Sequence, residues 1–296
     1  MTESAARMAG EANKARRHAM VLHVITRSLL YVIVIVLSFV FALPLLWMLV
    51  TALKDDPDVF RLPPVWIPNP IRWANFPEAL TIIPFGMHLL NTLKIAVPVV
   101  IGTLLSCSLV AYGFARIDFP GRGALFFLCL ATMMIPFQVR MIPLYIQFRN
   151  LGWLNTYKPL IVPAFFGGAY PIFMLRQFFM TIPQELSDAA RIDGCSELLI
   201  FLRIILPLAK PSLAVVGLFT FMGSWDNFIG PLIYLNDAKL YPISVALRGF
   251  QSEFWEKHLW QYMMAASATT IAPVIIIFYL AQRTLVEGIT VTGIKG

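Results

Sequence analysis

Apolar residues gather in six long runs along the chain, separated by shorter polar segments. The runs cover approximately Ser28–Leu53, Leu89–Phe114, Ala124–Val139, Pro159–Met180, Ser212–Leu235 and Met263–Ala281. A membrane-spanning helix needs about 20 mostly apolar residues, or fewer where it packs inside protein. The third run is short, and glycine, proline or polar residues interrupt the fourth and fifth. The pattern therefore predicts an all-α integral membrane protein with six spans.

These spans divide the chain into four parts. We expect an N-terminal tail at 1–27, a first transmembrane helix at 28–53, a five-helix transmembrane domain at 85–283 and a C-terminal tail at 284–296. The N-terminal tail has an excess of basic residues, with Arg7, Lys14, Arg16, Arg17 and Arg27 against Glu3 and Glu11. Positively charged flanks stay in the cytoplasm, and an even number of spans returns the chain to the same side. Both termini are therefore expected to be cytoplasmic.

Composition narrows the class of protein further. The chain is 58% hydrophobic and 13% charged, with a mean hydropathy of +0.74, whereas globular proteins carry about 25% charged residues. A soluble enzyme and a disordered chain are thus disfavoured. The net charge is +7, but the basic residues lie between apolar runs, which indicates membrane flanks and no nucleic-acid partner. Cys107, Cys129 and Cys195 lack the spacing of a metal site or disulfide framework.

The polar loop at 181–211, between the fourth and fifth spans, has the most informative pattern. Thr181 and Gln184 fit a capping box, which predicts a helix from about Ile182 to Asp193. Gly194 can then adopt the left-handed conformation that ends a helix. Ser196 can cap a second helix. The loop should form a helix, a sharp turn and another helix.

Each of these two helices has a distinctive face. On the first, Ala189, Ala190 and Asp193 are helical neighbours and form a small-residue face, with Asp188 and Arg191 at its edge. The second has an apolar stripe made of Leu198, Phe201, Leu202 and Ile205. The faces fit either docking of another protein or an amphipathic connector on the membrane surface. Spacing alone does not choose between these interpretations.

Three sequence strings resemble a known family. The string DAARIDG at 188–194, followed by Phe201, Leu206, Pro207 and Pro211, resembles the EAA loop of the membrane subunits of binding-protein-dependent ABC importers. WDNFIGPLIYL from Trp225 and QRTLVEGITVTGIKG at the C-terminus are similar to sugar-importer permeases of the MalG type. The resemblance implies the type I ABC importer transmembrane fold.

In that family the first loop helix is a coupling helix that docks into a cleft on the cytoplasmic ATPase. The resemblance assigns ATPase docking to Asp188, Ala189, Ala190, Arg191, Asp193, Gly194, Phe201 and Pro207. Two positions depart from the family pattern, because aspartate stands at Asp188 and Asp226 where glutamate is usual. The shorter acid at Asp188 reduces its reach toward a partner by one methylene.

The C-terminal tail has two interpretations. By composition, EGITVTGIKG is too polar and glycine-rich to continue the sixth span, which indicates a solvated end. The resemblance implies instead that the tail reaches between the ATPase subunits, with Gly288, Gly293, Lys295 and Gly296 in contact there.

The expected partners are a second homologous permease, two ATPase subunits, an extracytoplasmic solute-binding protein and membrane lipid.

Polar interruptions of the fourth and fifth spans indicate a substrate path. Trp225, Asp226 and Asn227 interrupt the fifth span, and Tyr170 lies near the glycines of the fourth. Ionisable residues at membrane depth are usually paired or face a cavity. The alternative is an interfacial anchor at Trp225 and a structural role for Asp226. The aromatic segment Asn236–Gln261 fits either an interface for the solute-binding protein or an aromatic belt.

The sequence lacks the motifs of nucleotide-binding proteins, metalloproteases and serine hydrolases. No G-x-x-x-x-G-K-[ST] string is present, so we expect a non-enzymatic subunit that binds no cofactor, with ATP and Mg²⁺ bound by the partner ATPase. No histidine pattern fits a metalloprotease, and G-x-S-x-G is absent. An ion-gradient-driven secondary transporter is the alternative, but paired intramembrane acids and an inverted repeat are not evident. The expected function is therefore a permease subunit of an ATP-driven importer for a sugar or sugar-like solute in a bacterial cytoplasmic membrane.

Overall fold

The computed structural model describes residues 2–252 and 259–293, and side chains at 20–250 and 259–282. Every regular element in this part of the chain is helical. The α-helices are α1 (Thr2–Ala52), α2 (Asp56–Val59), α3 (Asn75–Ile82), α4 (Phe85–Arg116), α5 (Arg122–Ala131), α6 (Phe137–Asn150), α7 (Lys158–Ile161), α8 (Ala169–Thr181), α9 (Gln184–Ile192), α10 (Glu197–Ile200), α11 (Leu206–Leu208), α12 (Lys210–Trp225), α13 (Ile229–Tyr234), α14 (Ile243–Ala246), α15 (Gly249–Ser252) and α16 (Trp260–Gly293). Shorter turns are η1 (Thr132–Met134), η2 (Val162–Phe166), the π-helical η3 (Phe201–Ile205) and η4 (Ala238–Leu240).

Within the residues that the structure describes, four helical segments are long and apolar enough to cross a membrane, and two bent pairs raise the number to as many as six. The straight segments are Met20–Ala52, Phe85–Arg116, Lys158–Thr181 and Trp260–Gln282. The pair Arg122–Met134 and Phe137–Asn150 bends by 97°, and the pair Glu197–Leu208 and Lys210–Trp225 bends by 79°. The all-helical fold is thus confirmed. The third apolar run, expected as one short span, is instead the first arm and the corner of a bent pair.

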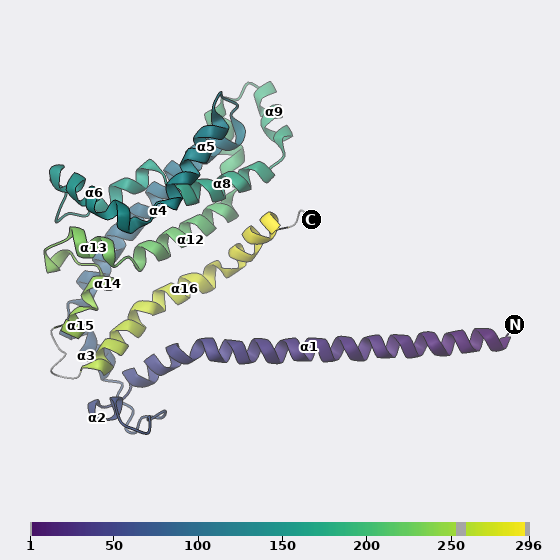
Figure 1. Ribbon diagram of the computed structural model, residues 1–296, viewed down its shortest axis with the longest axis horizontal. Coiled ribbons are helices and arrows are strands. Elements are labelled where there is room, and N and C mark those ends of the chain that lie inside the picture. The colour runs from purple at the N-terminus through teal and green to yellow at the C-terminus, as the bar shows by residue number, and fades with distance from the viewer. Residues whose placement is uncertain (1, 253–258, 294–296) are drawn as a thin grey trace.

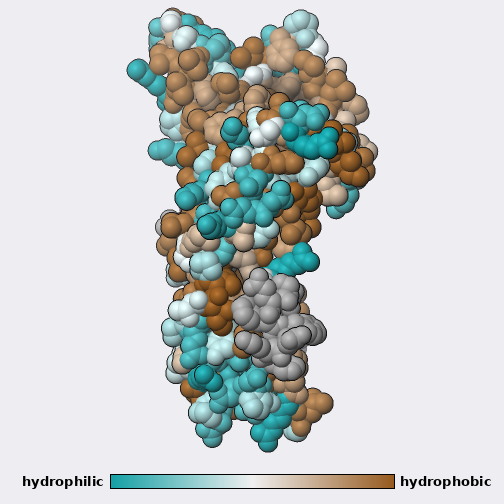
Figure 2. Space-filling view, turned by 90° about the vertical axis from the view of Figure 1, so that its left-hand side faces the viewer, coloured by the Kyte–Doolittle hydropathy of each residue, from teal (hydrophilic) through white to brown (hydrophobic). Residues whose placement is uncertain are grey.

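The long helices α1, α4, α12 and α16 run from one end of the molecule toward the other, at different tilts (Figure 1). The start of α1, the end of α16 and the loop helix α9 lie toward one end of the molecule, and α2, α3, α6 and α13–α15 lie toward the other. We call these the α9 end and the α3 end. Figure 2 faces the α3 end and shows hydrophilic side chains over its middle and lower parts.

Both chain ends are helical for longer than the sequence indicates. α1 runs without a break from Thr2 to Ala52, so no structural boundary separates the expected tail at 1–27 from the first span. α16 continues to Gly293, and the expectation that the glycine-rich segment cannot extend the sixth span is wrong for its backbone up to that residue. A glycine in a helix costs only about 1 kcal/mol relative to alanine, which by itself is too little to end a long helix.

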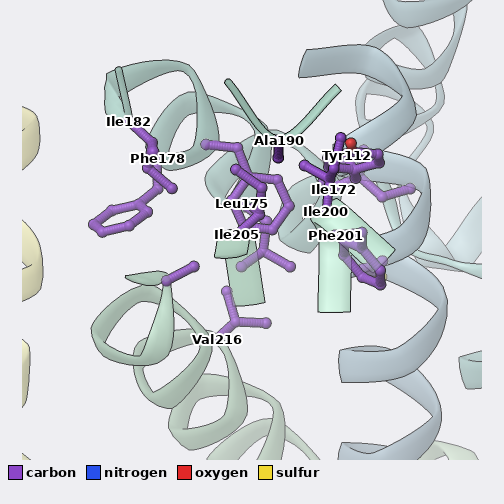
Figure 3. Close-up of a cluster of buried hydrophobic side chains, with 14 residues drawn as sticks. Tyr112, Ile172, Leu175, Phe178, Ile182, Ala190, Ile200, Phe201, Ile205 and Val216 are labelled. Atoms are coloured by element: carbon purple, nitrogen blue, oxygen red, sulfur yellow. The ribbon is translucent and has the colours of Figure 1, made fainter. Parts of the chain in front are cut away.

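Two large clusters of buried apolar side chains hold the helices together. The α9-end core joins α4, α8, α9, η3 and α12, with Leu175, Ile200 and Ile205 at its middle (Figure 3). The α3-end core joins the end of α1 to α3, α14, α15 and α16. α4 contributes to both, through Phe85 at the α3 end and Cys107, Ala111 and Tyr112 at the α9 end.

The interrupted fourth span packs closely on α4. Gly167 has a φ of +89°, which separates η2 from α8. The hydroxyl of Ser106 donates to the carbonyl oxygen of Ala164 at 2.9 Å. A Cβ atom at Gly102 would lie 2.6 Å from the ring of Phe165. The missing side chain at Gly102 therefore lets the irregular η2 segment approach the helix.

This contact predicts that Gly102→Ala lowers the stability of the protein. The ring of Phe165 would have to move, and overpacking of a closely packed contact costs about 1–3 kcal/mol. Gly113→Ala is the matched control, since nothing lies within 4 Å of its Cβ position on the same helix. Thermal unfolding of the purified protein in detergent measures both. Equal melting temperatures for the two variants, or no recovery in the Gly102→Ala, Phe165→Ala double variant, would contradict the packing account.

Candidate functional site

The loop at 181–211 forms a helix, a turn and a second helix, as the sequence predicts, but its start differs. The hydroxyl of Thr181 donates to the carbonyl oxygen of Phe178 at 2.7 Å, so this residue extends α8. α9 begins at Gln184 after an extended Pro183, without a side-chain cap. The expected capping box is therefore wrong, because each of its side chains finds another partner.

The turn after α9 is formed as the sequence predicts. Gly194 has a φ of +79°. Its N–H donates to the Arg191 carbonyl at 3.0 Å, and the N–H of Cys195 donates to the Ala190 carbonyl at 2.9 Å. This pair of bonds is a Schellman motif, which closes the end of a helix. The hydroxyl of Ser196 then accepts from the N–H of Leu199 at 3.4 Å and caps α10.

The faces of α9 are divided differently from the prediction. Ser187 and Ala190 are buried against the protein, so Ala190 belongs to the inward face and not to the expected docking face. Ala189 and Asp193 are exposed, as expected for that face. Between them, Ile192 is 87% exposed. The outward surface of α9 is thus an exposed apolar residue flanked by a small and an acidic one.

The predicted apolar stripe on the second helix is buried at two of its four positions. Phe201 and Ile205 are buried, whereas Leu198 and Leu202 are exposed. Phe201–Ile205 form a π-helical turn, in which the N–H of Leu206 donates to the carbonyl of Phe201. The wider turn changes the helical register, which a pattern based on 3.6 residues per turn does not anticipate. Pro207 follows in the first turn of α11.

A chain of charged hydrogen bonds crosses the loop. Asp188 accepts from Arg191 at 2.7 Å, and the Nε of Arg191 donates to Glu197 at 2.7 Å. The other oxygen of Glu197 accepts from the hydroxyl of Tyr112 on α4 at 2.6 Å. The bond to Glu197, with a smaller contribution from Asp188, raises the pKa of Arg191 above its ordinary value. The side chain of Asp188 stays 55% exposed although it is paired within its own helix.

A buried arginine holds the junction between α8 and α9. Arg116, in the last turn of α4, is only 6% exposed. It donates to the carbonyl oxygen of Phe179 at 2.6 Å, to that of Ile182 and to the side-chain oxygen of Gln184. The last carbonyls of a helix lack partners within the helix, and a cation satisfies both their hydrogen-bonding capacity and the helix dipole. Arg116 therefore fixes the angle at which α9 leaves α8.

The residues that hold the loop were not identified by the sequence motifs. Tyr112 and Arg116 lie outside the loop, and Glu197 lies within it but is not among the residues to which the resemblance assigns docking. One signal was available for Tyr112 and Arg116. They are four positions apart at the end of an apolar run, and residues with this spacing share a helix face.

The structure does not bring the four expected substrate-path residues together. Asp226 and Asn227 line a cavity of about 660 Å³ whose other walls include Arg140 of α6. Tyr170 lines a separate cavity of about 250 Å³ between α8 and α12. Trp225 is buried against Phe221, with ring centroids 5.3 Å apart, and lines neither cavity. Of the expected tail contacts, Gly288 and Gly293 lie in α16, whereas Lys295 and Gly296 lie outside the described residues.

Comparison with known proteins defines the class. Residues 99–291 match the family described as binding-protein-dependent transport system inner membrane component. A solved bacterial ABC transporter involved in import of the acidic polysaccharide alginate has a chain with a TM-score of 0.76 and 24% identity, over 86% of this chain and 95% of that one. The fold is that of an ABC importer permease.

Curated relatives agree with this class. The arabinooligosaccharides transport system permease protein AraQ of Halalkalibacterium halodurans is 33% identical over 88% of this chain and 93% of its own. The sn-glycerol-3-phosphate transport system permease protein UgpE of Yersinia pestis is 34% identical over 83% and 89%. The probable ABC transporter permease protein YurM of Bacillus subtilis is 33% identical over 86% and 84%. The chain therefore belongs to the family of inner-membrane components of binding-protein-dependent transport systems.

The turn geometry predicts that Gly194→Val abolishes solute uptake while the protein still inserts into the membrane. A β-branched residue is strained at a positive φ, so the angle between α9 and α10 would change. Gly194→Asn is the matched control, because asparagine tolerates this conformation. Uptake by cells and the amount of membrane-inserted protein are measured together. Normal uptake by the valine variant would contradict the turn's role.

Proposed function

We propose that this chain is one of two permease subunits through which an ATP-driven importer passes a sugar or sugar-like solute. The observation that carries the proposal is the geometry of α9, a short helix that presents an exposed Ile192. Arg116 of α4 binds Gln184 at the start of α9, and Tyr112 of α4 binds Glu197, which in turn binds Arg191 near the end of α9. The names of the relatives refer to arabinooligosaccharides and sn-glycerol 3-phosphate, and that of the solved transporter refers to alginate. These solutes are all rich in hydroxyl groups.

Docking of α9 on a cytoplasmic ATPase accounts for its outward surface. A helix laid in a groove buries apolar side chains that would otherwise face water. Ile192 and Leu186 are exposed on α9, with the carboxylates of Asp188 and Asp193 beside them. The partner groove should therefore combine an apolar pocket with basic residues. ATP and Mg²⁺ would be bound by that ATPase and not by this chain.

The remaining partners follow from the two ends and the sides of the molecule. With the α9 end in the cytoplasm, both termini are cytoplasmic and the α3 end faces outward, where a solute-binding protein would meet the segment after α13. Most side chains of α1 from Met20 to Phe41 are apolar and exposed. Lipid and a second permease would cover them.

The larger cavity is the best candidate for the solute path. Its lining includes Asp226, Asn227 and Arg140, together with Phe137 and Phe228. Few polar groups among apolar and aromatic walls are typical of small-molecule sites. A hydroxylated solute could use both kinds of contact. Tyr170 would line a different part of the path.

The test uses the purified complex of both permeases and the ATPase in lipid vesicles with the solute-binding protein. Arabino-oligosaccharides, sn-glycerol 3-phosphate and alginate oligosaccharides are each supplied as the solute. We expect one of them to stimulate ATP hydrolysis and to be taken up only with ATP. Uptake driven by a proton or sodium gradient without ATP would support the secondary transporter and overturn the proposal.

For Asp188 we predict that Asn weakens coupling and Glu does not. Asn removes the charge that would meet a basic residue of the ATPase, whereas Glu restores the longer acid usual in the resembled family. ATP hydrolysis and uptake by the complex are measured for both variants. Asp118→Asn is the control, because Asp118 in the α4–α5 connection is exposed and its ion pair within the described part of the chain is with Arg122. Equal activity of Asp188→Asn, Asp188→Glu and the unchanged protein would leave an apolar docking surface without an ionic contact.

For the C-terminus we predict that deletion of 291–296 reduces solute-stimulated ATP hydrolysis. The deletion removes the last turn of α16 and Lys295, which would meet an acid between the ATPase subunits. Complex yield is measured in parallel. Unchanged stimulation with unchanged yield would show that this segment is dispensable.

A further inference from the structure

α4 carries buried polar side chains near both of its ends. His88, Asn91 and Thr92 lie near its start, and Tyr112 and Arg116 near its end. Buried polar groups are stable only when they are hydrogen-bonded. Their partners therefore show which segments the helix holds. From Thr92 to Tyr112 the helix extends about 30 Å, at about 1.5 Å per residue.

The start of α4 holds the main chain of the segment after α13. The Nδ1–H of His88 donates to the carbonyl oxygen of Tyr241 at 2.8 Å. The amide of Asn91 donates to the same oxygen at 3.2 Å and to that of Lys239 at 2.7 Å. The hydroxyl of Thr92 accepts from the N–H of Ile243 at 2.9 Å. Segment 239–243 is thus attached to little more than one turn of α4.

The end of α4 holds the loop helix in a comparable way. Arg116 binds the α8–α9 junction, and Tyr112 binds Glu197 and, through it, Arg191 of α9. Both ends of α9 are therefore connected to a single turn of α4. A helix fixed at two points cannot rotate against its support without breaking these bonds.

The middle of α4 is braced by its neighbours. Gly102 and Ser106 pack on η2, and α8 and α12 lie along the same helix. Pro98 lies inside α4 and removes one bond of the helical ladder, but the helix continues through it. Packed interiors transmit displacement because they have little free volume.

We propose that α4 mechanically links the α9 loop to segment 239–243, so that movement of one displaces the other. Tyr112 and Arg116 at one end, and Asn91 and Thr92 at the other, act as positioning residues in this link. The proposal rests on docking of α9 on the ATPase. Segment 239–243 lies in the region where the solute-binding protein is expected. The link would therefore couple the ATPase state to that surface.

The test follows amide hydrogen exchange by mass spectrometry in the complete complex in nanodiscs. Mg-ATP with orthovanadate is the probe, and the complex without nucleotide is the reference, so no solute is needed. In the unchanged complex we expect exchange to change both at 184–200 and at 236–247. A wild-type complex with no change at 184–200 would overturn the docking proposal and, with it, the link.

Two conservative variants interrupt the link at its two ends. Tyr112→Phe keeps the ring that packs on Phe201 but removes the bond to Glu197. Thr92→Val keeps the side-chain shape but removes the acceptor for Ile243. In both variants we expect the nucleotide-induced change in hydrogen exchange at 184–200 to remain. The change in exchange at 236–247 should fall about fivefold, a factor at the small end of those by which one site affects another in allosteric proteins.

The matched control is Ser108→Ala, which removes a buried hydroxyl from α4 that bonds only the carbonyl of Leu105 in the same helix. We expect it to retain both changes. The Thr92→Val, Tyr112→Phe double variant should lose no more than either single variant, because both interrupt one path. A full change at 236–247 in both single variants would show that other helices carry the movement, and would overturn the proposal while leaving docking intact.

Discussion

The buried guanidinium of Arg116 is the constraint on which the α9 end depends. An arginine charge removed from water is costly unless hydrogen bonds replace its hydration. Here the acceptors are the carbonyl oxygens of Phe179 and Ile182 at the α8–α9 junction and the side-chain oxygen of Gln184 at the start of α9. The guanidinium can keep all of these bonds only with the helices in this arrangement. The angle between α8 and α9 is thereby fixed, and the apolar residues of η3 can pack beneath them.

The same constraint explains why α4 has a central place. Its polar ends attach to main-chain groups of other segments, and its apolar length contributes to both large cores. By contrast, α1 contacts the remainder of the chain chiefly through α16 and exposes apolar side chains from Met20 to Phe41. Such a surface is stable in lipid or against another subunit. A permease whose helices pack closely around α4, and whose α1 exposes apolar side chains, is suited to act within a larger complex.

Local signals allowed much of the fold and the turn of the loop to be predicted. Apolar runs of membrane length identified the spans, and Gly194 with Ser196 identified the turn, because these features depend on neighbouring residues. The capping box at Thr181 and the inward orientation of Ala190 depend on what packs against them, so spacing was insufficient. The π-helical turn at 201–205 likewise changed the buried stripe. Arg116 and Tyr112 could not be assigned roles, since their partners are distant along the chain. Trp225 and Asp226, adjacent in sequence, point to different surroundings because α12 ends between them.

Site-specific photocrosslinking tests the central claim most directly. A benzoylphenylalanine at Ile192, the most exposed apolar position of α9, is activated in membranes that contain the assembled importer. The same group at Ile67, which is 82% exposed toward the α3 end, is the reference. Docking predicts a covalent product with the ATPase subunit from position 192 and none from position 67. An importer that hydrolyses ATP but yields no ATPase adduct from position 192 would contradict the account.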